Sequence, residues 1–424
     1  MSGSLPFGFG APDEGQPSFD MNQLGAMLQH LGRLMQSGGG EGAVNWELAR
    51  DTARQSLAAA GDPSVSEAER RAVDQAVSLA QVWLDPACTF PTSSPDGLAW
   101  SRSEWLEGTS AAWQRIVAPI AEHVQDAMKA PADGALPPEL AAMLPEGVPP
   151  EAAAMLAPLM GMARQMGSAL FGMQMGQGLA ALATEVVGAA DVGVPLTTDH
   201  RPVLLPRNVA AFGDGLDIPP DEVRLYLALR ECAHQRLFAH VPWLAARLEG
   251  AIDAYARGIR VDTDRLGSAM RDIDPTALQD PSRLQELMGS DMFELADSPE
   301  QQAALVRLET LLALIEGWVS DVVAQASSAT LPSAGRLEEA VRRRRAAGGP
   351  AEKTFASLVG LELRPRALRE AAHLWRLLRE EGRIEGRDAL WAHPDLLPDH
   401  EDLQDPEAFV RRSAEGPLGL DGSD

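Results

Sequence analysis

The chain has 424 residues, of which 45% are hydrophobic and 23% are charged, the usual composition of a globular protein long enough to bury a large core. Its formal net charge of -25 repels phosphate backbones and anionic lipid surfaces, so we expect no nucleic-acid partner. The two cysteines cannot form a disulfide framework, and the N-terminus lacks the basic and apolar regions of a signal peptide. We therefore expect an acidic, cytoplasmic protein, and composition leaves its oligomeric state undetermined.

The two ends of the chain differ in composition from the rest. Residues 1–18 are rich in Gly, Pro and Ser and are predicted to form a flexible tail, and residues 411–424 are predicted to form a second one. Residues 19–410 are expected to form one mostly helical domain. A proline-rich stretch at about 131–150 is interpreted as a linker or long loop inside that domain.

Helical periodicity dominates the chain between the tails. Helices are predicted near residues 21–35, 44–60, 66–84, 101–128, 155–188, 221–240, 243–259 and 305–326. Ser101 and Glu104 form a capping-box pattern, and Pro119 predicts a kink or break in the helix that follows. The stretch 195–220 contains VLLPRNVAAF, which predicts a short strand or two. The expected fold class is mainly α with a small β element.

A Met-rich segment from Met155 to Gly188 has two interpretations. One is a membrane span or an adaptable binding surface, supported by the GxxxG spacing of Gly172 and Gly176. The other is a buried helix, because Arg164 and Gln174 interrupt the apolar run and Met with Gly suits close packing. We favour the buried helix and expect no membrane span.

A basic run covers Arg342 to Arg345. It resembles a nucleic-acid patch, but Glu338, Glu339 and Glu352 flank it. We interpret the run as a solvated helix end.

The segment that indicates chemistry is YLALRECAHQRLFAHVPWL, from Tyr226 to Leu244. In a zinc peptidase helix, two histidines four residues apart bind one Zn²⁺, and a glutamate directly after the first histidine polarises the bound water. Glu231 and His234 match the glutamate and the second histidine, and Arg230 stands in place of the first histidine. A guanidinium cannot coordinate a metal, because it has no lone pair available.

Other residues are candidates for the missing ligand. His240 lies six residues after His234, the offset of the third histidine in an extended zinc motif, although Leu237 replaces the glycine of the turn between them. Glu249 and Asp253 lie on the next predicted helix, and Glu316 lies on a later one.

Two interpretations need no metal. Arg230, Glu231 and His234 can form a buried polar cluster in which each group is satisfied by another. Arg230 and Arg236 can instead grip a planar acid in an anion-binding pocket.

Several further groups have structural interpretations. Glu370 and His373 repeat the Glu-x-x-His spacing, but Leu374 and Trp375 indicate a core helix. Cys232 is interpreted as a packing residue. A reserve set of possible ligands is expected to serve as turns and caps of an ordered loop: His393, Asp395, His400, Glu401 and Asp402.

Four segments carry a family resemblance: FGMQMGQGLAALATEVVG, LALRECAHQRLFAHVPWL, LIEGWV and VGLELRPRALREAAHLW. With them, the chain from Val44 to Phe409 resembles a bacterial zincin-like family of hydrolases known as zinc-dependent metalloproteases.

The resemblance implies a helical zincin-type fold in which the motif helix packs over a small sheet. It implies that Glu231 corresponds to the general base, that His234 corresponds to the second histidine ligand, and that Glu316 corresponds to the glutamate of a later EGHA-like segment. Trp318 stands where that segment has its histidine, and Arg230 stands where the first ligand belongs.

The leading hypothesis is a zincin-like metallohydrolase of peptidase type, acting on a peptide or protein, with zinc held at a degenerate or rebuilt site. His234, Glu316 and a third ligand such as His240 would hold the zinc, with Glu231 as general base. The alternative is a non-catalytic zincin-fold protein that binds a partner. Geometry separates the two: ligands converging on His234 favour the enzyme, and Arg230 paired with Glu231 or Glu316 favours the binding protein.

Overall fold

The computed structural model describes residues 42–129, 150–258, 298–346 and 367–415. The chain divides into two units, residues 1–41 and 42–424, and every described residue belongs to the second. The expected tail at 1–18, the expected helix at 21–35 and most of the expected linker lie outside the described residues. Within those described ranges, no helix has both the length and the apolar character needed to cross a membrane.

The second unit is mainly α with a small β element, as predicted. Its α-helices are α2 (Trp46–Ala59), α3 (Glu67–Leu84), α4 (Arg102–Lys129), α6 (Pro150–Glu185), α7 (Pro206–Gly213), α8 (Pro220–His240), α9 (Pro242–Arg257), α12 (Pro299–Ser327), α13 (Ala334–Ala346), α15 (Leu368–Ala389), α16 (His400–Gln404) and α17 (Pro406–Glu415). The short 3-10 helices η2 (Leu390–Ala392) and η3 (Pro394–Leu396) follow α15, and the strands are β1 (Leu98–Ala99) and β2 (Val203–Leu204).

The predicted capping box at the start of α4 is present. The Ser101 amide donates to Glu104 Oε2 at 2.6 Å, and the Glu104 amide donates to Ser101 Oγ at 3.1 Å. Pro119 lies inside α4 without ending it. A proline removes one helical hydrogen bond, whereas Val117 and Ile120 on either side of it are buried, so packing holds α4 through the proline.

Helices α2 and α6 approach each other closely because of two glycines. A Cβ on Gly172 would lie 2.6 Å from the Asn45 carbonyl oxygen, and a Cβ on Gly176 would lie 2.3 Å from the Ala49 carbonyl oxygen. The GxxxG spacing therefore serves helix packing inside this unit. Among the described side chains of α6, Met175 and Leu179 are buried whereas Leu170 is 41% exposed, so one face of the helix is closely packed and the other is exposed.

The β element is a two-stranded parallel sheet. Leu98 pairs with Val203 and Ala99 pairs with Leu204, so the strand expected in VLLPRNVAAF is β2. Gly188 forms an isolated antiparallel bridge to Leu204. Helix α8 packs against β2, the arrangement that the family resemblance implies.

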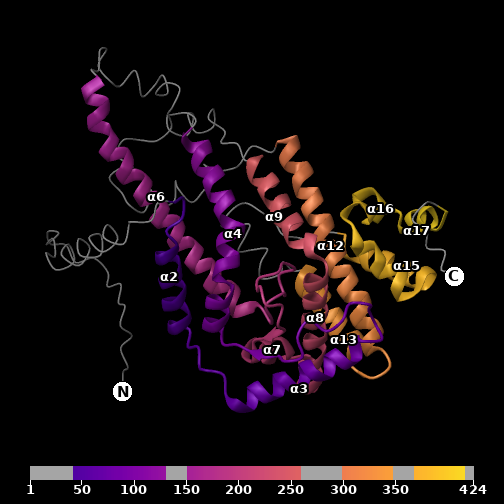
Figure 1. Cartoon of the computed structure of the whole chain (residues 1–424). Coiled ribbons are helices and arrows are strands. Elements are labelled where there is room, and N and C mark those ends of the chain that lie inside the picture. Colours follow the sequence, from indigo (N-terminus) through magenta and orange to yellow (C-terminus); the bar gives the residue numbers. More distant parts are fainter. Residues whose placement is uncertain (1–41, 130–149, 259–297, 347–366, 416–424) are drawn as a thin grey trace, which may run out of the picture. The chain divides into compact units, whose positions relative to one another are not determined.

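Helices α8 and α12 form the centre of the described structure and lie side by side (Figure 1). Helix α8 also contacts α3 and α7, and α12 also contacts α9 and α15. Arg387, which is fully buried on α15, donates to Asp321 on α12 and to Asp388 at 2.8 Å each, and Trp318 Nε1 donates to Asp388 at 2.8 Å. This network fixes α15 against α12 and gives the buried Trp318 N–H a hydrogen-bond acceptor.

One predicted boundary is wrong. The C-terminal tail was expected from residue 411, but α17 continues to Glu415. Phe409 is buried against the core, and the buried Ser413 hydroxyl donates to the Phe409 carbonyl at 2.9 Å. Packing of this apolar face extends the helix through a sequence whose composition is polar.

Candidate functional site

The motif helix α8 is almost entirely enclosed. Pro220 begins the helix, and Asp221 and Glu222 in its first turn favour the positive end of the helix dipole. From Leu225 to Phe238 every residue is buried, including the charged ones. Cys232 is fully buried and burial raises the pKa of its thiol, which agrees with a packing role.

His234 points its imidazole at α12. Its Nδ1 donates to the Arg230 carbonyl oxygen at 2.9 Å, and its Nε2 lies 2.9 Å from Glu316 Oε1. A hydrogen bond from one ring nitrogen is how proteins orient a histidine ligand, which leaves Nε2 as the nitrogen for a metal. Here Nε2 contacts a carboxylate. Both ring nitrogens of His234 therefore face oxygen atoms of the protein.

Arg230 lies one turn before His234 and reaches the same carboxylate. Its Nη2 donates to Glu316 Oε2 at 2.6 Å, and both side chains are buried, with 7% and 1% of their surfaces exposed. The residue at the first ligand position therefore pairs with the residue that the resemblance assigns to a later ligand position. Burial raises the pKa of the neighbouring Tyr226 to about 12, so its hydroxyl stays protonated at neutral pH.

A second guanidinium occupies the other oxygen of Glu316, and sequence reasoning missed it. Arg345 on α13 donates through Nη2 to Glu316 Oε1 at 2.6 Å and to the Asp191 carbonyl at 3.1 Å. The helical spacing agrees with this position once the burial of its neighbours is known. Arg345 lies four residues after Val341 and eight after Leu337, and both of these are buried, so all three share one face of α13.

The basic run is therefore only partly a solvated helix end. Arg342 and Arg343 pair with Glu339 on the surface of α13. Arg344 turns inward and donates to Asp191 Oδ2 at 3.1 Å, with 24% of its side chain exposed. The predicted solvent-facing orientation was wrong for Arg344 and Arg345, because both side chains lie on the inner face of α13.

Glu231 faces a different set of partners. Its Oε2 accepts from the Ala190 amide at 3.0 Å, and its Oε1 accepts from the Val203 amide at 3.3 Å and from Gln235 Nε2 at 2.9 Å. A Cβ on Gly188 would lie 2.5 Å from Glu231 Oε2, so only glycine lets the backbone approach this carboxylate. Glu231 therefore connects α8 to β2 and to Ala190 in the segment before β2.

The surroundings of Glu231 and Glu316 shift the pKa values of these two carboxyl groups in opposite directions. Burial raises the pKa of Glu231, and its hydrogen bonds from Gln235 and the Ala190 amide only partly oppose this. Burial also acts to raise the pKa of Glu316, but Arg345, His234 and Arg230 outweigh it and hold that pKa well below its usual range. Glu316 is therefore ionised at neutral pH as the centre of a cationic cage.

The other predicted ligands lie elsewhere. His240 is exposed at the end of α8, donates through Nδ1 to the Arg236 carbonyl at 2.9 Å and stacks on Phe90 with 6.0 Å between ring centroids. Glu249 pairs with Arg115 at 3.2 Å. Asp253 pairs with Arg257 at 3.1 Å.

His234 and Glu316 are the two potential ligands that meet. Within the four described ranges, no group of three or more His, Cys, Asp or Glu side chains is placed to hold a metal ion. A zinc site in a protein has at least three protein ligands. Two guanidinium groups also hold the oxygens of Glu316, so the residues present do not fit a zinc ion in this arrangement.

Arg236 does not take part in an anion-binding pocket with Arg230. Its side chain is fully buried on another side of α8, where it donates to Gln81 Oε1 at 2.9 Å, to Asp85 at 2.7 Å and to the Phe90 carbonyl at 3.1 Å. The six-residue offset between the two arginines rotates them to different faces of a helix. This alternative is contradicted.

The remaining candidate ligands have structural roles. Asp399 and Asp402 form the capping box of α16, and His393 accepts from the Asp395 amide at 3.2 Å as the cap of η3. The expectation of turns and caps is confirmed for His393 and Asp402. His373 Nε2 lies 3.0 Å from Glu407 of α17, at the protein surface.

Comparisons with known proteins agree with this geometry at the level of the fold. A family described as zincin-like metallopeptidase matches residues 44–410. A crystal structure described as a putative hydrolase with a novel fold, from Chloroflexus aurantiacus, aligns with 19% identity and a TM-score of 0.60, covering 88% of this chain and 99% of that one. Among curated proteins, none matches this chain. With a family match over most of its length, the chain belongs to the zincin-like metallopeptidase family.

Proposed function

We propose that this protein is a metal-free member of its family that acts by binding a partner and not by hydrolysis. The observation that carries the proposal is the contact of Arg230 with Glu316 at 2.6 Å, with Arg345 on the other oxygen of the same carboxylate. Two guanidinium groups supply two positive charges, the formal charge of Zn²⁺, and they neutralise Glu316 from within the chain.

The charge substitution explains how the fold persists without a metal. A buried carboxylate without a partner costs several kcal/mol, roughly, so a family fold that lost only its metal would leave Glu316 uncompensated. Arg230 on α8 and Arg345 on α13 remove that cost and also join three helices at one carboxylate. The site therefore keeps a structural role while losing the open coordination position that hydrolysis of a peptide needs.

A second candidate is the metallohydrolase of peptidase type. It is supported by family membership and by His234 Nε2, which points at Glu316 Oε1 at 2.9 Å. In that case His234 and Glu316 would hold zinc with a third ligand, and Glu231 would be the general base. Arg230 and Arg345 would have to withdraw from Glu316 first. A peptide or protein would be its substrate class.

Zinc content decides between the two candidates. Untagged wild-type protein is purified, incubated with excess Zn²⁺, desalted and measured by mass spectrometry for metal, next to a His234→Ala variant. We expect no bound zinc in either. Near-stoichiometric zinc in the wild type that is lost in His234→Ala would overturn the metal-free proposal and support the hydrolase.

A restored motif provides the matched positive control. The double variant Arg230→His, Arg345→Met places a third ligand beside His234 and Glu316 and removes both guanidinium groups. We expect this variant to bind about one zinc ion per chain, because three protein ligands and an open position are the composition of a catalytic zinc site. Circular dichroism and thermal melting confirm that each variant is folded.

The two cysteines bear on the cellular compartment of the protein. Cys88 and Cys232 are both free and buried. This state agrees with a reducing compartment, and we infer a cytoplasmic location.

A further inference from the structure

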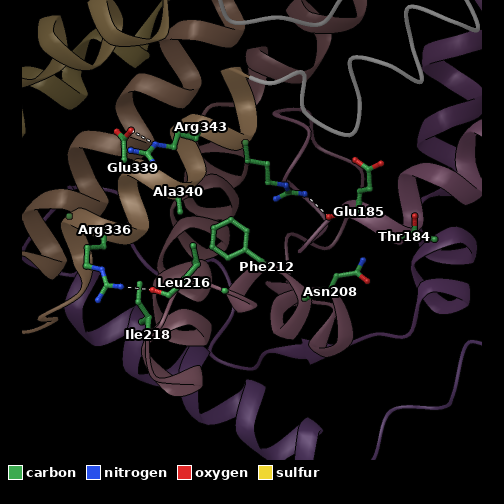
Figure 2. A pocket seen from close by; sticks show the side chains of 14 residues that line it. Thr184, Glu185, Asn208, Phe212, Leu216, Ile218, Arg336, Glu339, Ala340 and Arg343 are labelled. Atoms are coloured by element: carbon green, nitrogen blue, oxygen red, sulfur yellow. Dashed lines mark hydrogen bonds and ion pairs between the residues drawn. The ribbon is translucent and has the colours of Figure 1, made fainter.

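A pocket of about 810 Å³ lies beside the motif cluster and is separate from it. Its walls come from the end of α6, from α7, from the chain that follows α7, and from α13. In Figure 2 the Phe212 ring lies at the centre, with residues of α13 on one side and Thr184 and Glu185 on the other. Phe212, Leu216 and Ile218 give the pocket an apolar floor. Its volume is within the roughly 300–1,000 Å³ range of small-molecule sites.

Three arginines of α13 line the same pocket: Arg336, Arg343 and Arg344. Arg343 is paired with Glu339 at 2.7 Å. Arg336 donates to the Leu216 carbonyl and, among the described residues, pairs with no carboxylate (Figure 2). Its charge is therefore without a counterion inside the described part of the protein.

Arg344 also has N–H groups that donate to no described residue. It uses Nη2 for both of its bonds, to Asp191 and to the Glu185 carbonyl, and its guanidinium lies 5.8 Å from the centroid of the Phe212 ring. A guanidinium has five N–H donors in a planar fork that matches a carboxylate. Nε and Nη1 of Arg344 have no acceptor among the described residues. They point to different sides of the guanidinium, so each offers a single hydrogen bond beside the Phe212 ring.

The charge of the lining selects the kind of anion. Three arginines and two glutamates line the pocket, and Asp191 beside it pairs with Arg344, so the three positive charges meet three negative charges. Arg336 is the lining arginine that pairs with no carboxylate of the described residues. A single negative charge is balanced by Arg336, whereas a phosphate dianion or a nucleic-acid strand would also meet the carboxylates around the pocket and the net charge of -25. The lining therefore favours a monoanion over a polyanion.

We propose that this pocket binds a carboxylate attached to an apolar body, with the carboxylate at Arg336 and Arg344 and the apolar part on Phe212. Two sources share this chemistry: a free organic acid, or the C-terminal carboxylate of a peptide that ends in an apolar residue. The pocket lies outside the cluster around Glu316, so the inference stands whether or not the protein binds zinc.

Isothermal titration calorimetry tests the inference on the full chain in the presence of EDTA. The probes are octanoate with octanamide as its neutral match, and N-acetyl-Ala-Leu with its C-terminal amide. We expect at least one acid to bind about tenfold more tightly than its amide, as one charge-assisted hydrogen bond gives. Octanoate alone would identify a free acid as the ligand, and the dipeptide alone would identify a peptide C-terminus.

Variants separate the two halves of the pocket. Arg336→Gln should remove the tenfold preference for acid over amide, and Phe212→Ala should weaken acid and amide by similar factors. Arg115→Gln, an exposed arginine paired with Glu249 on other helices, is the control and should leave binding unchanged. Equal binding of acid and amide, an unchanged preference in Arg336→Gln, or no binding of any probe at about 1 mM would overturn the inference.

Discussion

Replacing Glu316 by glutamine tests the claim that one buried carboxylate holds two arginines and a histidine together. Glu316 is 1% exposed and contacts Arg230 at 2.6 Å, Arg345 at 2.6 Å and His234 at 2.9 Å. Removing one partner of a buried ion pair typically costs about 3–5 kcal/mol. Glutamine keeps one acceptor oxygen, and Arg345 is 15% exposed and can turn toward water. We therefore expect a loss near the lower end, about 3 kcal/mol of unfolding free energy at pH 7.

The pH dependence gives an independent check. The pKa of Glu316 is lower in the folded protein than in the unfolded chain. Its contribution is therefore fully present above the unfolded pKa of about 4.3 and is lost as pH falls toward the folded pKa. The difference between wild type and Glu316→Gln should be largest at pH 7 and should shrink below about pH 4.

Urea unfolding followed by circular dichroism, at pH 7 and at about pH 3.5, measures both effects. Glu107→Gln is the matched control, because its pair with Arg54 is exposed and such pairs are worth about 0–1 kcal/mol. A loss below about 1 kcal/mol for Glu316→Gln at pH 7 would refute the reasoning. A double-mutant cycle with Arg345→Met should show a coupling energy above about 1 kcal/mol.

Two further predictions concern packing and buried charge. Gly176→Ala should lower the unfolding free energy by about 1–3 kcal/mol, because its Cβ would lie 2.3 Å from the Ala49 carbonyl oxygen. Gly167→Ala on the same helix is the control: its Cβ would meet nothing within 4 Å, so this variant should be neutral or stabilising. Thermal melts that rank the two variants alike would contradict the close contact at Gly176. Arg236→Met should lower the unfolding free energy by about 3 kcal/mol or more, because several acceptors lose their buried donor. Arg224→Met on the same helix is the control and should change the unfolding free energy by less than about 1 kcal/mol. Equal urea midpoints for the two variants would refute this role of Arg236.

The sequence alone determined the helical fold class and most helix positions. Periodicity and local caps act within a few residues, as at Ser66 with Glu69 and Ser101 with Glu104, so they can be found without knowing the rest of the chain. The resemblance to the family was also found from the sequence, and it was this resemblance, not periodicity, that associated Glu316 with the motif helix. The C-terminal boundary was missed, because packing of Phe409 extends α17 beyond what its polar composition suggests.

Only the tertiary structure decided what occupies the motif site. Arg345 lies 29 residues after Glu316 and 115 after Arg230, and no local rule connects these positions. Whether an arginine at the end of a helix faces solvent or enters the core depends on what lies across from it, and here the buried Glu316 and the partly buried Asp191 stabilise the inward orientation. The same spacing on α13 would support a solvated end if no buried carboxylate faced it, because a guanidinium enters the core only where its charge is compensated.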